Sequence, residues 1–144
     1  MAEISFIVYG EPVAQARAGR RNFIKAQKAR TQAFDPEKSA SFKDKVYDQA
    51  VSVKPERPIE TAIAITVKVY KSIPKGMAQY KQKLALAGEL RPITKPDLDN
   101  IIKAVKDALK GVVWRDDSQV VSFGHSGKWY SDVPRVEITV RELP

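Results

Sequence analysis

Two hydrophobic periods recur along this chain, one typical of strands and one typical of helices. Thr61–Tyr70 alternates with a period of two and is rich in β-branched residues, so it predicts a strand. Short apolar runs predict three more strands, at Ile4–Tyr9, Val120–Phe123 and Val136–Val140. Gly127–Pro134, with Lys128, Trp129 and Tyr130, lies between the last two of these strands, and we interpret it as their connection.

Apolar residues at every fourth position predict a helix over Pro36–Val53. Asp35 would serve as its N-cap, with Pro36 at the first helical position. A second helix is expected over Met77–Ala87, because Gly88 follows it as a typical C-terminal glycine.

The strongest helical pattern follows Pro96 and ends at Gly111. Its apolar residues fall on one stripe, which comprises Leu98, Ile101, Ile102, Val105, Ala108 and Leu109. Charged residues occupy the opposite side, namely Asp99, Lys103, Lys106 and Lys110. Strands and helices are mixed without regular alternation, and no long linker or repeat divides the chain. We therefore expect an α+β fold, a single domain over residues 1–144 with a mixed sheet packed against helices.

The composition narrows the chemistry that the chain can support. A net charge of +8 points to a polyanionic partner. Cysteine is absent and His125 is the single histidine, which excludes disulfides, thiolate sites and zinc sites built from several imidazoles. Any bound metal would have oxygen ligands, which favours Mg²⁺ or Mn²⁺. No apolar run is long enough for a membrane span and no signal peptide is evident, so we expect a cytoplasmic protein without a membrane partner.

Two acidic pairs stand out in this basic chain. Asp97 and Asp99 are two residues apart where a loop enters the strongest helix, and Asp116 and Asp117 follow Trp114. Carboxylates held close together repel one another unless a cation lies between them. One interpretation is a divalent metal site. The other is an N-cap with a favourable first-turn charge, followed by ordinary turn residues.

A calcium-binding EF-hand loop also begins with this acidic spacing. That interpretation fails because Ile102 occupies the glycine position and Ala108 the closing glutamate position. Lys103 lies one helical turn after Asp99 on the same face. It is either a surface ion-pair partner or a cation that stabilises charge on a phosphate.

The phrases KPDLDN and KDAL, the lysine at Lys103, and the later WRDDSQV resemble the RusA family of Holliday junction resolvases, found in bacteria and their prophages. The resemblance is specific over Lys95–Val121 and looser at GEPVA near the start, at Lys128 and at the final strand, Val136–Val140. It implies that Asp97, Asp99 and Asp117 coordinate Mg²⁺ and that Lys103 is essential for cleavage. It also implies a homodimer with an α/β core. Ser72–Thr94 is longer than we would expect from the resemblance to the shortest members of the family.

A basic segment without any acidic residue spans Val13–Phe34. Its cations are Arg17, Arg20, Arg21, Lys25, Lys28 and Arg30. This segment is either a solvated face or an arm that follows a DNA backbone, and we favour the arm. Lys128 joins it as a candidate DNA contact. Trp129 and Tyr130 can stack on unpaired bases, but packing within the sheet is the more ordinary role. We interpret His125 as a polar strand residue, not as a general base.

The function predicted from these features is Mg²⁺-dependent cleavage of four-way DNA junctions by paired symmetric nicks, in recombination and repair. Asp97, Asp99, Lys103 and Asp117 are its predicted catalytic residues. Two alternatives stay open: a non-catalytic nucleic-acid-binding protein, and a metal-dependent flap nuclease or RNase with the same acidic pocket. The sequence leaves undecided whether Asp116 is also a ligand and whether one or two ions bind.

Overall fold

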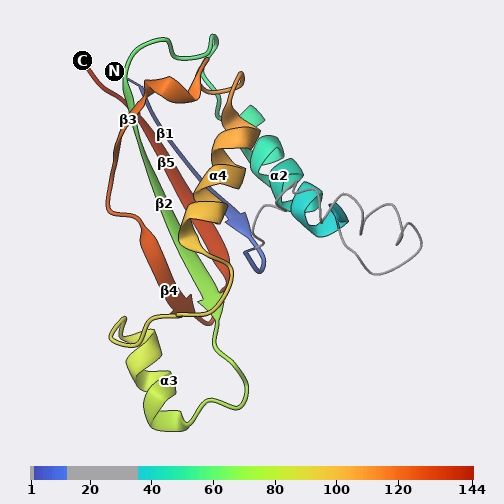
Figure 1. Cartoon of the computed structure of the whole chain (residues 1–144), viewed down its shortest axis with the longest axis vertical. Coiled ribbons are helices and arrows are strands. Elements are labelled where there is room, and N and C mark those ends of the chain that lie inside the picture. Colours follow the sequence, from blue (N-terminus) through green and yellow to red (C-terminus); the bar gives the residue numbers. More distant parts are fainter. Residues whose placement is uncertain (1, 13–35) are drawn as a thin grey trace, which may run out of the picture.

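Within residues 2–12 and 36–144, which the computed structural model describes, five strands form one mixed sheet and two helices cover one of its faces (Figure 1). In chain order the elements are β1 (Glu3–Tyr9), α2 (Pro36–Val51), β2 (Ile63–Ser72), α3 (Gln79–Leu86), α4 (Leu98–Leu109), the 3-10 turn η1 (Asp117–Gln119), β3 (Val120–Phe123), β4 (Gly127–Ser131) and β5 (Arg135–Glu142). The predicted α+β class is confirmed.

The sheet is ordered β1-β5-β2, with antiparallel pairing between these strands. Two short strands then share the remaining edge of β2 and run parallel to it. β3 pairs with the first half of β2 and β4 with the second half. At the joint between them, the Gly124 N–H donates to the Ile65 carbonyl over 2.8 Å, and the Val67 N–H donates to Ser126 Oγ over 2.9 Å. A Cβ atom at Gly124 would fall on the Thr66 hydroxyl, so this close approach requires glycine.

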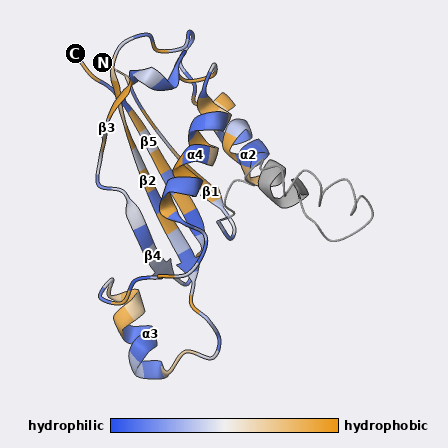
Figure 2. Cartoon of the chain, viewed as in Figure 1, coloured by the Kyte–Doolittle hydropathy of each residue, from blue (hydrophilic) through white to orange (hydrophobic). Residues whose placement is uncertain are grey.

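The hydrophobic core lies between the sheet and the helices α2 and α4 (Figure 2). Alternate residues of β2 point into it, and Ile63, Ile65, Val67 and Val69 are fully or almost fully buried. The apolar stripe predicted for α4 is buried against the same face through Ile101, Val105 and Leu109. The opposite face of the sheet carries polar and charged side chains, as is common for sheets covered on one side only.

Most predicted elements agree with the structure to within two residues at each end, and two predictions are wrong. His125, expected to be a strand residue, lies in the bend between β3 and β4. Gly127–Ser131, expected to be part of a connection, forms β4. Its five residues are too few for a readable alternation, and its partner β2 is more than 50 residues earlier in the chain. Long-range pairing, not local pattern, makes this segment a strand.

The segment between β2 and α4 contains α3, which projects beyond the end of the sheet (Figure 1). Gly88 ends this helix with φ of +80°, as its position predicted. Arg91 fastens the segment to β4. Its guanidinium lies 4.3 Å from the centre of the Trp129 ring, and its Nε donates to the Lys128 carbonyl over 2.6 Å. In the described part of the chain, no helix has the length and apolar character that crossing a membrane requires.

Candidate active site

The N-terminus of α4 carries the first acidic pair. Asp97 is the N-cap residue, with the extended backbone (φ −69°, ψ 142°) that this position prefers, yet its side chain makes no capping hydrogen bond. The helix is begun by backbone alone, because the Ile101 N–H donates to the Asp97 carbonyl over 3.2 Å. Asp97 and Asp99 are both exposed. The carboxylate of Asp97 is therefore available to a ligand, and the capping interpretation does not account for it.

Lys103 follows Asp99 by one turn, and its side chain is exposed on the outer surface of α4. Asp107, one turn further on, lies on the flank that faces α2, where it pairs with Lys43 over 3.7 Å. Asp99 and Lys103 therefore share an outward surface that neither the sheet nor α2 covers.

Two lysines lie beneath the start of α4, one on β2 and one on β4. Lys71 Nζ donates to Thr94 Oγ1 over 2.9 Å and also to the Lys95 carbonyl. Lys128 Nζ donates to the Thr94 carbonyl over 2.5 Å. Burial lowers the pKa of the Lys128 ammonium, and the charge of Lys71 lowers it further, while the carboxylate of Asp97 acts in the opposite direction. Lys71, Lys128 and Asp97 are therefore close enough to affect one another electrostatically.

The second acidic pair lies in the turn between α4 and β3. Asp116 is the N-cap of η1, and its side chain accepts a hydrogen bond from the Ser118 N–H over 3.4 Å. The Gln119 side chain accepts from the Asp116 N–H over 2.7 Å and completes a capping box. Asp117 is half-buried and accepts a hydrogen bond from the indole N–H of Trp114 over 3.1 Å. Asp116 thus has a local structural role, whereas Asp117 is oriented by a core residue.

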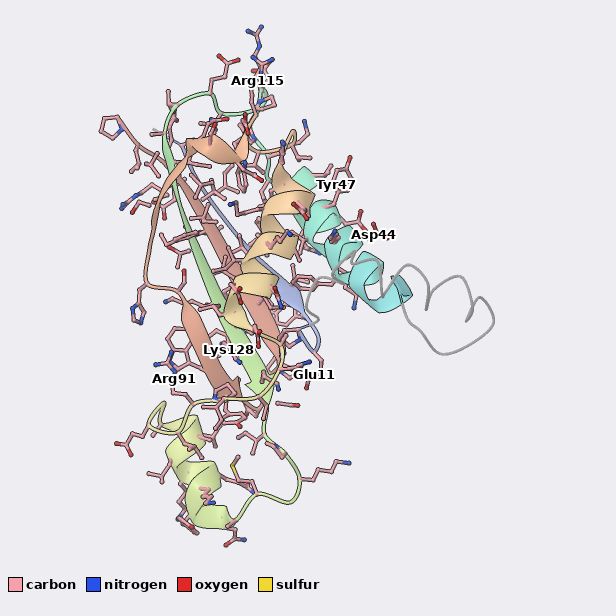
Figure 3. All side chains as sticks on the ribbon, viewed as in Figure 1. Glu11, Asp44, Tyr47, Arg91, Arg115 and Lys128 are labelled. Carbon is pink, nitrogen blue, oxygen red and sulfur yellow. The ribbon has the colours of Figure 1, made fainter. Side chains whose placement is uncertain are left out.

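Within one chain, the structure does not bring Asp117 together with Asp97 and Asp99. Asp97 precedes α4 and Asp117 follows it, and a helix of 12 residues is about 18 Å long. In Figure 3, Arg115, two residues before Asp117, lies near one end of the sheet, and Lys128, which bonds to Thr94 three residues before Asp97, lies nearer the other end. Among the residues that the structure describes, no three acidic or histidine side chains lie close enough to hold a metal ion. Proximity along the sequence was a poor guide here, because a rigid helix separates the two pairs.

The six predicted DNA contacts of the basic segment, Arg17, Arg20, Arg21, Lys25, Lys28 and Arg30, lie outside the described residues, as does Asp35. Lys128, the seventh, faces the start of α4. Its neighbour Trp129 lies on the other face of the sheet. There the indole stacks on Tyr70 with ring centres 5.7 Å apart and also contacts His125. This agrees with the packing role that we favoured for Trp129.

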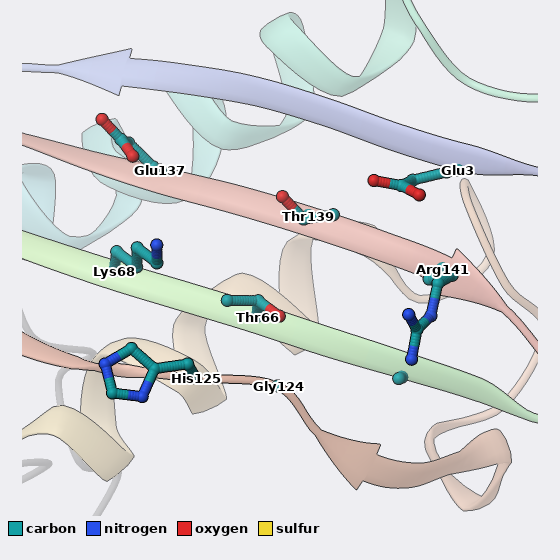
Figure 4. Close-up of a pocket in the computed structure, with 9 residues that line it drawn as sticks. Glu3, Thr66, Lys68, Gly124, His125, Glu137, Thr139 and Arg141 are labelled. Atoms are coloured by element: carbon teal, nitrogen blue, oxygen red, sulfur yellow. The ribbon is translucent and has the colours of Figure 1, made fainter.

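The uncovered face of the sheet holds a groove of about 360 Å³ (Figure 4). Charges of both signs line it, namely Glu3, Lys68, Glu137 and Arg141. Next to this groove, burial and the charge of Glu137 raise the pKa of Tyr70, against the opposing effect of Arg135. The groove lies on the face opposite α4 and is separate from the acidic pair.

Lys71 also belongs to the candidate site, although the sequence patterns did not single it out. The signal was present in the alternation of β2, where Val67 and Val69 are buried and Lys71 is the next residue on that face. A lysine that ends a buried stripe extends its apolar stem along the core and places its charge at the edge. That position brings its ammonium under the start of α4.

A sheet with helices on one face, an exposed carboxylate pair at a helix start and adjacent lysines is an arrangement suited to a metal-dependent enzyme acting on phosphodiesters. The comparisons with known proteins agree. The family described as Endodeoxyribonuclease RusA matches residues 9–141. The chain is also 46% identical over 142 residues to a Bacillus subtilis (strain 168) protein described as "Uncharacterized protein YqaN", covering 97% of this chain and 96% of that relative.

The chain belongs to the RusA family of endodeoxyribonucleases. It is therefore an enzyme that hydrolyses phosphodiester bonds, a Holliday junction resolvase. Nucleases of this family generally depend on a divalent metal.

Proposed function

We propose that this enzyme resolves four-way DNA junctions by paired symmetric nicks, with Mg²⁺ or Mn²⁺ as its cofactor, in DNA recombination and repair. The proposal rests on the Asp97 carboxylate at the start of α4. It makes no capping hydrogen bond and is exposed beside Asp99 and close to two lysines. Such an enzyme would act in the cytoplasm, where bacterial DNA lies.

The donor set fits a hard divalent cation. Asp97, Asp99 and Asp117 offer carboxylate oxygens, which Mg²⁺ and Mn²⁺ prefer. When bound, such an ion supplies Lewis acidity toward the phosphate and lowers the pKa of a coordinated water. The protein's own residues do the rest. The exposed ammonium of Lys103 would balance negative charge on the scissile phosphate, and the basic segment would hold the DNA backbone.

We further propose that the site is completed by a second copy of the chain. Asp97 lies near the end of β2 that carries Lys71. Asp117 lies near the other end of β2, where the Gln119 side chain donates hydrogen bonds to the carbonyl oxygens of Ile59 and Thr61. The ends of this ten-residue strand are about 30 Å apart. A single chain with this separation cannot place all three carboxylates on one ion.

A two-fold axis offers a simple solution. The level halfway along β2 coincides with the joint at Gly124–Ser126, between β3 and β4. An axis just outside this edge, at the level of the joint and perpendicular to the sheet, would set the two α4 helices antiparallel. Asp117 of each chain would then lie at the level of Asp97 and Asp99 of the other. Dimers with such isologous contacts are the commonest form of oligomer.

The edge formed by β3 and β4 supports this arrangement. Phe123 is 55% exposed, although its register partner Ile65 points into the core on the helix-covered face. Val121, also in β3, is 61% exposed. Exposed apolar residues on an edge strand are typical of a surface that another chain covers. Two related sites in one particle also fit the need for two nicks in each junction.

The test is complementation between inactive chains. One chain carries Asp97→Asn and Asp99→Asn, the other carries Asp117→Asn, and different affinity tags allow purification of the heterodimer. Each homodimer should leave a synthetic four-way junction uncut in Mg²⁺. The heterodimer keeps one intact composite site and should therefore nick one strand of the junction.

If every site were built within one chain, this heterodimer would contain no intact site and would stay inactive. An inactive heterodimer, with both tags present in equal amounts, would therefore refute the composite site. A flap, a duplex and an RNA junction serve as comparison substrates. Faster cleavage of any of these than of the four-way junction would contradict the proposed substrate.

A further inference from the structure

Two lysine ammoniums converge on the short segment that leads into Asp97. Lys71 donates to the Thr94 hydroxyl and to the Lys95 carbonyl, and Lys128 donates to the Thr94 carbonyl. The two lysines come from neighbouring strands, β2 and β4, which are paired in parallel. Three polar atoms of two consecutive residues are thereby fixed to the sheet, two residues before the acidic pair begins.

The sequence makes these lysines unusual choices for mere surface residues. Lys71 continues the buried stripe of Val67 and Val69, and Lys128 is the register partner of Val69. Both are only half-exposed, so their stems pack along the end of the core. Two like charges this near to one another raise the electrostatic energy of the fold, and burial adds to that cost. This electrostatic cost suggests that the two ammonium groups have a specific role at this position.

We propose that Lys71 and Lys128 are positioning residues for the Asp97 carboxylate, which they hold in place through the Thr94–Lys95 segment. This inference rests on the proposed metal site. The side chain of Asp97 makes no capping hydrogen bond, so the helix itself does not orient it. The lysines supply the missing restraint through the backbone, and their charge offsets the repulsion between Asp97 and Asp99.

This role differs from direct contact with DNA. A lysine that only binds phosphate contributes to DNA affinity and to its salt dependence, and removing its positive charge would not weaken metal binding in the absence of DNA. A lysine that orients a ligand changes metal affinity with no DNA present, since residues that support metal ligands typically contribute 10- to 100-fold. The two roles therefore separate in a measurement without nucleic acid.

The experiment measures Mn²⁺ binding by the DNA-free dimer, using the electron paramagnetic resonance signal of unbound Mn²⁺. Lys71→Met and Lys128→Met keep the apolar stem and remove the ammonium. Each should weaken Mn²⁺ binding about tenfold or more. Lys68→Met is the matched control, because Lys68 is on the same strand as Lys71 but faces the groove on the other side of the sheet. It should bind Mn²⁺ like the wild type.

Mn²⁺ affinity equal to or tighter than that of the wild type in both methionine variants, with weaker DNA binding, would overturn the proposal and identify the lysines as phosphate contacts. Thermal unfolding monitors the fold. If Lys71→Met does not fold, Lys71→Gln replaces it, because a shorter neutral donor should still loosen the segment. If the Asp97→Asn and Asp99→Asn variants bind Mn²⁺ as tightly as the wild type does, the proposed metal site itself is refuted.

Discussion

Trp114 donates its indole N–H to Oδ1 of Asp117 over 3.1 Å, and its ring is completely buried. The carboxylate is thereby oriented by the hydrophobic core. Trp114 itself is held by bridge pairing to Ile59 and Lys110. Asp117, which lies far from Asp97 and Asp99 within one chain, thus has a fixed orientation. A metal ligand presented to a neighbouring molecule would need such an orientation.

Replacing Trp114 with phenylalanine should test this link between core and site. Trp114→Phe removes the N–H donor and part of the ring, so we expect a loss of about 1–3 kcal/mol in the free energy of unfolding, measured with urea. Junction cleavage should fall more than tenfold because Asp117 loses its orientation. Val113→Ala is the control, since Val113 is equally buried and makes no bond to Asp117. Equal cleavage losses in both variants would show that reduced stability alone explains the effect.

Helix α4 illustrates what the sequence alone could predict. Its apolar stripe, its start after Asp97 and its end before Gly111 all follow from local signals, and all three agree with the structure. Those signals depend on residues within one or two turns of each other. The acidic pair at its start could therefore be located correctly from the sequence.

The relationships that the sequence could not supply are all long-range. β4 depends on pairing with β2, and Lys128 and Trp129, adjacent in the chain, point to opposite faces of the sheet. The distance between Asp97 and Asp117 depends on the length and direction of α4 between them. Patterns of residue type carry little information about such distances.

The joint between β3 and β4 should tolerate no side chain at Gly124. Gly124→Ala would place a methyl group on the Thr66 hydroxyl, so we expect a loss of about 1–3 kcal/mol in the free energy of unfolding. The double variant with Thr66→Ala should recover part of this loss, because it removes the closest atom and leaves the Thr66 Cβ 3.2 Å away. Urea unfolding of the four proteins of this cycle gives the coupling. Strictly additive losses would contradict the predicted clash.

The basic segment should determine the salt dependence of DNA binding. We expect that replacing Arg17, Arg20 and Arg21 with glutamine weakens binding to junction and duplex alike. The slope of log K against log salt should fall by about 0.9 for each lost phosphate contact. Fluorescence anisotropy at several salt concentrations measures this slope. Lys54→Gln, at an exposed lysine after α2, is the control. A slope that is unchanged in the triple variant would identify the segment as a solvated face.

We expect the fold to lose stability in acid, because protonation of Glu142 removes a stabilising carboxylate. Its carboxylate accepts hydrogen bonds from the Ala2 N–H over 2.9 Å and from the Thr61 hydroxyl over 3.2 Å, and so fastens the start of β1 and the approach to β2 to the end of β5. The hydrogen bond from Ala2 is the main cause that lowers the pKa of Glu142 below its ordinary value of 4.5, and the bond from Thr61 adds to it.

A carboxylate with a lowered native pKa stabilises the fold fully above its unfolded pKa. This contribution is lost as the pH falls through the native pKa. Glu142→Gln should therefore lower the urea midpoint at neutral pH, and its difference from the wild type should shrink and vanish in strong acid. Urea titrations between about pH 7 and about pH 2 measure this convergence. A difference that stays constant over this range would mean that the charge of Glu142 contributes nothing and that only its shape matters.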